Sequence, residues 1–314
     1  MTLERLNVQC NKAMPFVTPI GVILGLLLGS RLAPYKDLST LFFAIITFVG
    51  ALGISYRQFA LALRRLKDIF FVLVSAHVLL PVLTKVVASL IFSDPDLVTG
   101  FILLSSIPIA VSSFIWCTIF DGDGPLALSL ILLDTLLSPL ITPLTIRLLT
   151  DSSVIFDSRG IITSLVIMIV IPSLLGMLFS QYFPKAARTA VPYLNPFIKL
   201  LLIAVVVIHI GQLSGKLDFS WLYLPLALVN LLVIALSFVV IWFLATYLLK
   251  ADRASVVSMT YTGGMRNISA ALILATQFFP PRVSLPVILG ILLQQTFVGF
   301  LGSLLFSSKQ SKSI

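Results

Sequence analysis

Charged residues are scarce in this sequence. Of its 314 residues only 11% are charged, comprising 21 Lys or Arg and 12 Asp or Glu, while 59% are hydrophobic and the mean hydropathy is +1.11. A soluble globular domain carries about 25% charged residues, so there are too few here to coat a soluble protein of this length. The composition excludes a cytosolic enzyme, a nucleic-acid-binding module and a disordered chain. It leaves a protein that lies mostly in lipid.

Cysteine and histidine are also rare, with two of each. Cys10 precedes the first hydrophobic run and Cys117 lies inside another, so their placement predicts no disulfide framework. The acidic turn at residues 121–123 is too short and isolated to predict a metal site, and we expect neither a metal nor an organic cofactor. His77 and His209 lie within hydrophobic runs, where each either relays protons or is held by a hydrogen bond inside a helix bundle.

Long hydrophobic runs fill the rest of the chain. A helix needs about 20 apolar residues to cross the hydrocarbon of a bilayer, and the runs do not alternate as the strands of a membrane barrel would. The sequence therefore predicts an all-α membrane protein with ten spans. We expect them at 14–33, 38–55, 69–92, 97–120, 126–149, 161–183, 196–214, 221–249, 254–279 and 284–307.

Basic residues predict the orientation of these spans, because cytoplasmic loops carry an excess of Lys and Arg. With the N-terminus inside, twelve basic residues fall on the cytoplasmic side and six on the other. Both termini are then cytoplasmic in a multi-pass protein of the cell membrane. No small-residue cleavage site follows the first hydrophobic run, so we expect it to be a retained span.

Ten spans divide into two halves of five, residues 1–160 and 161–314. An odd number of spans per repeat turns the second copy upside down, which is the inverted-repeat plan of secondary transporters. The fourth span contains Pro108 and the ninth contains Gly263-Gly264, and both residue types disrupt helices. Interruptions at matching positions of two halves indicate a transport site.

If both helices restart near the membrane centre, two helix N-termini meet there and favour an anion. Ser or Asn follows each interruption and is expected to cap the new helix. The candidate binding residues at the two interruptions are Ser112, Ser113, Thr262, Gly263, Gly264, Asn267 and Ser269, to which Gln295 of the tenth span is added.

Two charges lie deep inside predicted spans, Arg266 in the ninth and Asp134 in the fifth. Charge at mid-membrane is costly and normally faces a cavity or a partner. We expect the two side chains to pair. Such a pair serves either as a substrate or ion switch, or as a buried ion pair that only fixes helix register.

Three segments resemble a known family. They are Phe48-Val-Gly50-Ala-Leu-Gly53 leading to Phe59, Thr135-Leu-Leu-Ser138-Pro139-Leu-Ile-Thr142-Pro143, and Gly264-Met-Arg266-Asn267. Together they resemble the bile acid/sodium symporter family, and the resemblance covers nearly the whole chain. It implies a core of spans 3–5 and 8–10 with spans 4 and 9 crossing, a panel of spans 1, 2, 6 and 7, and sodium-coupled transport by movement of one domain against the other.

The sequence departs from this family where the family binds sodium. Thr262 stands in place of a Glu, and Arg266 in place of the Gln of a Gly-x-Gln-Asn motif. The Ser and Thr ligands of span 5 fall at Ala127 and Ile131, and the crossing Ser-Asn pair falls at Ser113-Phe114, or at Ser112-Ser113 with a shift of one residue. Sodium requires several oxygen ligands and is repelled by a guanidinium, so the substitutions predict that the sodium sites are not retained.

The sequence therefore predicts a secondary active transporter of a small organic anion that works by alternating access without classical sodium coupling. Arg266 supplies a fixed positive charge, and Asp134 loads and releases a proton. The alternatives are an efflux carrier of the auxin or arsenite type, a sodium-coupled bile-acid-like symporter, a membrane-embedded enzyme and a sensor. The expected partners are the anion and the lipid bilayer, not nucleic acid.

Overall fold

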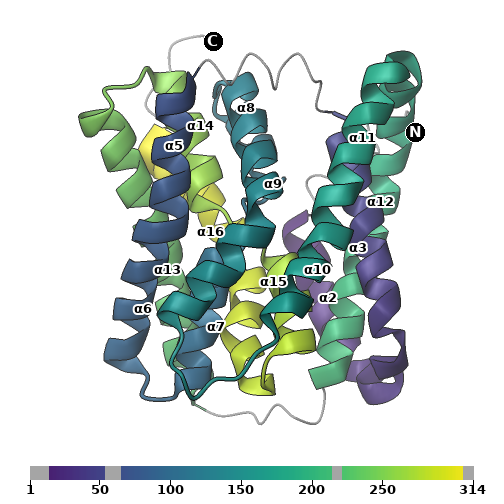
Figure 1. The fold of residues 1–314 in the computed structure, drawn as a ribbon, viewed down its shortest axis with the longest axis vertical. Helices are drawn as coiled ribbons and strands as arrows, with labels where there is room; N and C mark the ends of the chain where they lie inside the picture. Colours follow the sequence, from purple (N-terminus) through teal and green to yellow (C-terminus); the bar gives the residue numbers. More distant parts are fainter. Residues whose placement is uncertain (1–13, 54–64, 214–220, 307–314) are drawn as a thin grey trace.

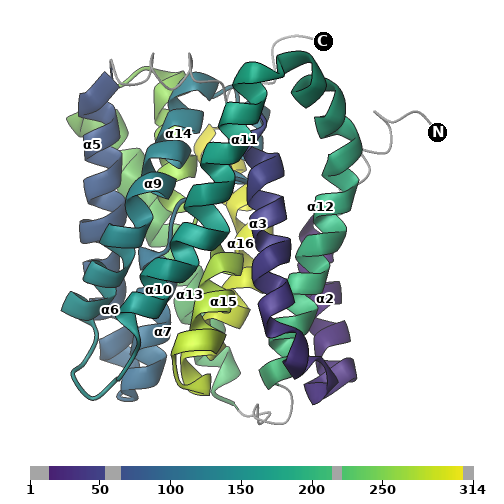
Figure 2. The ribbon, with the colours of Figure 1, turned by 45° about the vertical axis from the view of Figure 1, so that its right-hand side comes forward.

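The protein is described here from a computed structural model, which describes residues 14–53, 65–213 and 221–306. Helices make up 87% of the structure, and no β-strand occurs in these three ranges. Figures 1 and 2 show the helices standing side by side along the long axis of the molecule. The all-helical class predicted from the hydrophobic runs is confirmed.

Six helical segments are long and apolar enough to cross a membrane, and they correspond to predicted spans 3, 5, 6, 7, 8 and 10. Three of them contain a π-helical turn, in which a backbone N–H bonds to the carbonyl five residues earlier instead of four. The segments are α5 (Leu66–Val74) with η3 (Ser75–Leu79) and α6 (Leu80–Ile91); α9 (Gly124–Leu149); α10 (Ser158–Leu165) with η4 (Val166–Val170) and α11 (Ile171–Tyr182); α12 (Pro184–Leu213); α13 (Tyr223–Phe243) with η5 (Leu244–Leu248); and η6 (Pro281–Val283) with α16 (Ser284–Phe306). The chain is thus a multi-pass membrane protein.

The other four predicted spans are shorter or broken. The first is α2 (Met14–Leu28) followed by the 3₁₀ turn η1 (Gly29–Tyr35), and the second is α3 (Lys36–Ala51). The fourth consists of α7 (Pro95–Ser106) and α8 (Ser113–Ile119), and the ninth of α14 (Arg253–Gly264) and α15 (Ile268–Phe278). Both interruptions predicted from the sequence therefore exist.

One predicted boundary is wrong by twelve residues. Span 7 was expected to begin at residue 196, whereas α12 begins at Pro184 and runs without interruption through Pro192 and Pro196. Lys185 and Arg188 lower the hydropathy of this stretch, yet both are exposed, so they extend away from the helix while their stems lie along it. Proline is tolerated in membrane helices because neighbours supply the missing hydrogen bonds.

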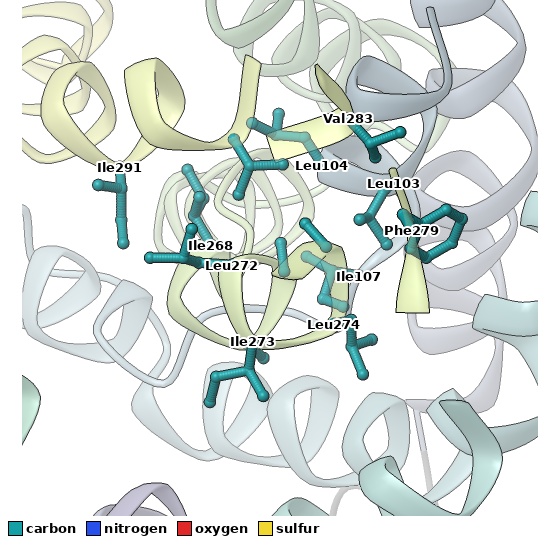
Figure 3. Close-up of a cluster of buried hydrophobic side chains, with 14 of the residues drawn as sticks. Leu103, Leu104, Ile107, Ile268, Leu272, Ile273, Leu274, Phe279, Val283 and Ile291 are labelled. Carbon is teal, nitrogen blue, oxygen red and sulfur yellow. The ribbon is translucent and has the colours of Figure 1, made fainter. Parts of the chain in front are cut away.

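The helices form two groups that also contact each other. Helices α2, α3, α11 and α12 contact one another and stand on the right of Figure 1, while α2 also contacts α16 and α12 contacts α15. Helices α6, α7, α13, α14 and α16 form a second set of contacts, with α13 against both α14 and α16. Figure 3 shows the hydrophobic cluster where α7 and α15 meet, with Leu103 near Phe279 and Ile107 near Leu274. One part of each broken span, α7 and α15, therefore lies in a hydrophobic core that α3 and α12 also enter.

Acidic side chains cap two helices at the end of the molecule where α5 begins. Asp123 accepts a hydrogen bond from the backbone of Leu126 at 3.0 Å and so caps α9, while Asp252 accepts one from Ser255 at 3.3 Å and caps α14. Arg65 joins both caps, donating to Asp123 at 2.6 Å and to the Ser255 hydroxyl at 2.8 Å. The acidic turn at 121–123 thus has a structural role in fixing the ends of three helices.

The Asp252 cap predicts a specific dependence of stability on pH. The Ser255 hydroxyl lowers the pKa of Asp252 below its ordinary value, so the cap stabilises the fold above the ordinary carboxyl pKa and that stabilisation is lost as pH falls through the lowered value. Asp252→Ala should lower the melting temperature at pH 7 by about 2–4 °C, the value of a typical N-cap. The difference from wild type should narrow below about pH 4.

Asp252→Asn is the matched control, because asparagine caps helices as well as aspartate does but does not titrate. It should keep the melting temperature at pH 7 and remove the contribution of this residue to acid sensitivity. Tryptophan fluorescence during heating, recorded from pH 3 to pH 7, measures both quantities. Equal acid sensitivity of the wild type and both variants would show that the cap does not contribute.

Candidate functional site

The two broken spans cross each other at their interruptions. The Ala110 N–H donates to the Met265 carbonyl at 3.1 Å, and the Asn267 N–H donates to the Pro108 carbonyl at 2.8 Å. Ile109 and Arg266 face each other as an isolated antiparallel bridge. Two segments more than 150 residues apart in the sequence are thereby joined by backbone hydrogen bonds, and α8 and α15 both begin at this crossing.

Proline and glycine create the two interruptions in different ways. Pro108 disfavours helical geometry in the residue before it, and Ile107 is accordingly extended with ψ 155°. Gly264 still belongs to α14, and a Cβ there would lie 2.6 Å from the ring of Phe238. The glycine pair therefore allows α14 to approach α13 closely, and the chain leaves the helix one residue later, at Met265.

The expected caps are only half confirmed. Asn267 caps α15, since its side-chain oxygen accepts from the Ala270 N–H at 3.4 Å. Ser112 makes no capping bond, because its backbone is already helical whereas a capping residue needs an extended one. Its hydroxyl instead accepts from the Gln295 side-chain amide at 3.1 Å. Ser113 is fully buried, and Ser269 is partly exposed in the first turn of α15.

Arg266 lies inside the helix bundle with only 4% of its surface exposed. Gln294 holds its backbone from both sides, accepting from the N–H at 3.0 Å and donating to the carbonyl at 2.9 Å. The guanidinium Nη2 donates to the carbonyl of Ala76 at 2.8 Å and of Gly263 at 3.3 Å. The sequence singled out Gln295, but the neighbouring Gln294 is the residue that positions the arginine.

A π-helical turn makes the Ala76 carbonyl available to the arginine. In η3 the Leu80 N–H bonds to the Ser75 carbonyl, five residues back. The next residue is Pro81, which has no N–H to offer. The Ala76 carbonyl therefore lacks a partner within its own helix, and Arg266 supplies one. The following carbonyl, of His77, accepts from the Thr145 hydroxyl at 3.3 Å in the same way.

Asp134 does not pair directly with Arg266, so that prediction is wrong. One oxygen of the fully buried carboxylate bonds to Nε2 of His77, and the other accepts from the backbone N–H of Ile109 at the crossing. No oxygen of Asp134 comes within 4.0 Å of the guanidinium, although the carboxylate still attracts it electrostatically. The same π-helical turn contacts both charges, since His77 binds Asp134 and the neighbouring Ala76 carbonyl binds Arg266.

The position of His77 within a hydrophobic run could have predicted its contact with Asp134. A histidine and an aspartate at mid-membrane depth in neighbouring spans are natural partners, but spacing along the chain does not show which of two basic side chains is nearer. Three ionisable residues thus meet behind the crossing: His77, Asp134 and Arg266. They come from three different spans.

A small pocket lies on the opposite side of the crossing, between the two groups of helices. Its volume is about 20 Å³, enough for a water molecule and far too small for an organic anion. The first group lines it with residues of α3, η4 and α11, and the second with residues of α9 and both interruptions. The lining residues are Thr47, Gly50, Ala51, Pro108, Val111, Ile131, Leu132, Thr135, Ile169, Ser173 and Asn267.

The remaining candidate positions are apolar or already engaged. The Thr262 hydroxyl donates to the Ser258 carbonyl of its own helix at 2.7 Å. Ala127 and Ile131 are buried and carry no side-chain oxygen. At the positions of the expected Ser-Asn pair, the Ser112 hydroxyl accepts from Gln295 and the Ser113 hydroxyl is buried without a hydrogen-bond partner among the described residues.

Comparison with known proteins agrees with this architecture. Residues 40–216 match the model of a family described as the Sodium Bile acid symporter family. The chain is 37% identical to the uncharacterized protein YbaS of Bacillus subtilis (strain 168), over 93% of this chain and 96% of that protein. It is 25% identical to a probable chloroplastic sodium/metabolite cotransporter, BASS2, of Oryza sativa subsp. japonica, over 85% of this chain and 65% of that longer protein. It is 24% identical to an uncharacterized sodium-dependent transporter, YocS, of Bacillus subtilis (strain 168), over 84% of this chain and 81% of that protein.

Proposed function

Since the chain belongs to the Sodium Bile acid symporter family, we propose that it is a secondary active transporter of a small organic anion that does not depend on sodium. The family is one of membrane transporters and not of enzymes. The observation that carries the specific proposal is the buried guanidinium of Arg266 behind the crossing. It provides a permanent positive charge where a sodium-coupled protein needs a mobile one.

The architecture that we propose has ten spans in two inverted repeats, residues 1–160 and 161–314. Spans 3–5 and 8–10 form the core, and spans 1, 2, 6 and 7 form the panel. The mutual contacts of α2, α3, α11 and α12 support this division, as does the matched position of the two interruptions, in the fourth and ninth spans.

We also propose that the protein lies in the cell membrane with both termini cytoplasmic. In Figure 1 the beginning of α5 and the end of α11 lie at one end of the molecule, and the α6–α7 and α9–α10 connections at the other. Arg65, Lys67, Lys185 and Arg188 belong to the first, proposed cytoplasmic end. Half of the twelve basic residues behind the prediction, namely Arg5, Lys12, Arg57, Arg64, Lys309 and Lys312, lie outside the described residues.

We propose that the anion site lies on the panel side of the crossing. The positive ends of the α8 and α15 dipoles favour a negative charge there. Most N–H groups of the two first turns are already bonded within the crossing, so the attraction comes from the dipoles. Asn267, at the start of α15, lines the small pocket at this point. Because the pocket has room for about one water molecule, substrate entry requires the core and the panel to move apart, as alternating access demands.

A bound sodium ion does not fit the residues that surround Arg266. Hard cations need several oxygen ligands. Thr262 offers an engaged hydroxyl, and Ala127 and Ile131 offer none. The Ser112 hydroxyl is bonded to Gln295, which leaves Ser113 with a side-chain oxygen that has no hydrogen-bond partner among the described residues. A sodium ion would also face the guanidinium. The names of BASS2 and YocS refer to sodium, so sodium dependence is the direct alternative to this proposal.

Two measurements with purified protein test the proposal. In proteoliposomes, uptake of radiolabelled mono- and dicarboxylates should be the same in sodium chloride and in choline chloride. Without any substrate, the melting temperature in detergent should also be the same in the two salts, because an ion that binds only the folded state would raise it. A strict sodium requirement for uptake, or stabilisation by sodium alone, would refute sodium independence.

A further inference from the structure

We propose that His77 is the binding site for a proton coupled to transport, that Nδ1 of its ring takes up the proton, and that Asp134 fixes the ring in the tautomer that makes this atom available. This inference rests on the proposed transport function and identifies its coupling ion. It uses the three ionisable residues behind the crossing, each of which is buried.

The hydrogen bonds of the ring determine its tautomer. His77 is 3% exposed, and its Nε2 bonds to a carboxylate oxygen of Asp134. An ionised carboxylate only accepts hydrogen bonds, so Nε2 carries the hydrogen and donates it. In the neutral ring Nδ1 is then an acceptor with a free lone pair. Among the described residues this atom has no hydrogen-bond partner, although it is buried.

An unpartnered acceptor buried in a membrane protein is costly unless it serves a purpose. Here the proton supplies the missing bond: a proton from water adds to the Nδ1 lone pair, an N–H bond forms, and the ring charge changes from zero to +1. Release reverses the same step on the other side of the membrane. The Asp134 carboxylate stabilises the imidazolium without taking the proton itself.

The surrounding charges make proton binding and anion binding favour each other. With neutral His77, Arg266 and Asp134 balance and the cluster has no net charge. Protonation raises the net charge of the cluster to +1, which matches one anion at the crossing. Asp134 also provides a physical link, since its second oxygen holds the Ile109 N–H in the interruption of span 4.

Other titratable groups lie too near the helix ends to take part. The π-helical turn of His77 packs against α5, α6, α7, α9 and α14. Asp134 lies near the middle of α9. The other charged residues of these five helices lie in the first or last turn of their helix, except Lys85, which lies within two turns of the end of α6. They are Lys67, Asp68, Lys85, Asp96, Arg147 and Arg253; Tyr261 of α14 directs its hydroxyl to the Val298 carbonyl at 3.5 Å.

Nitrogen NMR of the histidines tests the proposal without a substrate, because the chain has only two histidines. In ¹⁵N-histidine-labelled protein in nanodiscs, His77→Gln identifies the signals of His77 by their loss. We expect the Nε2–H tautomer at high pH and reversible protonation of Nδ1 on acidification.

His77→Gln also supplies the matched transport variant, because the glutamine amide can donate to Asp134 as Nε2 does but cannot bind a proton. Anion uptake should lose its dependence on the pH gradient in this variant while the melting temperature stays near that of the wild type. An Nδ1–H tautomer, a ring that does not titrate between pH 5 and 9, or gradient-dependent uptake in His77→Gln would overturn the proposal. None of these results concerns sodium, so failure of this inference is distinguishable from failure of sodium independence.

Discussion

Replacement of Arg266 by glutamine should reduce anion uptake at least tenfold while the protein remains folded. The arginine contributes the fixed positive charge at the crossing, and one charge at short range in a medium of low effective dielectric changes binding by more than the 1.4 kcal/mol that a tenfold loss represents. Glutamine is polar but shorter, so the Ala76 carbonyl also loses the donor that Arg266 provides. The variant Arg266→Lys separates the loss of charge from the loss of this hydrogen bond.

Two variants make this result interpretable. Arg266→Lys keeps the charge but replaces the planar fork by a single ammonium group, and it should retain part of the uptake. Arg253→Gln changes an exposed arginine at the start of the same broken span and should transport as the wild type does. Uptake is measured in proteoliposomes at equal protein content. Wild-type uptake by Arg266→Gln would assign the arginine to structure alone.

Replacement of Asp134 by asparagine should have the largest effect on stability of any single change at the site. It leaves the buried Arg266 without the nearby charge that balances it and removes the direct partner of His77. Leaving a buried charge uncompensated costs about 3–5 kcal/mol. Arg266→Gln should cost clearly less, because His77 can take up a proton and balance the remaining carboxylate. Loss of the Asp134 charge is thus expected to destabilise the protein more than loss of the Arg266 charge, even though both residues are buried.

A double-variant cycle measures this coupling. The protein with both Asp134→Asn and Arg266→Gln has no uncompensated charge, so it should be more stable than Asp134→Asn alone. Ser138→Ala, which removes another buried polar group one turn further along α9, is the control and should change stability by less than about 1.5 kcal/mol. Thermal unfolding in one detergent at pH 7 compares the wild type with these four variants. Additive effects of the two changes would mean that Asp134 and Arg266 do not interact.

Hydropathy predicted the larger features because a membrane imposes them on each segment independently. A run of about 20 apolar residues must form a helix that satisfies its own backbone hydrogen bonds, so predicted spans 3, 5, 6, 7, 8 and 10 appear as single long segments. The residue types Pro and Gly also predicted the interruptions at Pro108 and Gly263-Gly264 correctly, because the helices do stop there. The same reasoning failed at Pro192 and Pro196, because neighbouring helices decide whether a proline breaks a helix or is accommodated within it.

The contacts of the site were less predictable, since they depend on side chains brought together from different spans. Sequence reasoning identified Arg266 and Asp134 as the deep charges but paired them with each other. It could not foresee that a π-helical turn would direct a free carbonyl to Arg266 while the histidine of the same turn reached Asp134. Gln294 and Gln295 are indistinguishable by composition, and only the rotation of α16 determines which one holds the arginine.

The scarcity of charge in the sequence by itself determined that the chain lies in a membrane, that its helices are the elements of the fold, and that the few buried charges are the places to look for function. Each of these follows from the cost of exposing a polar group to lipid, which a single segment cannot avoid. Only the tertiary structure decided that the interruptions of spans 4 and 9 bond to each other, and that Asp134 binds His77 and not Arg266. Those outcomes depend on which helix faces pack together, and that choice is made by the whole bundle at once.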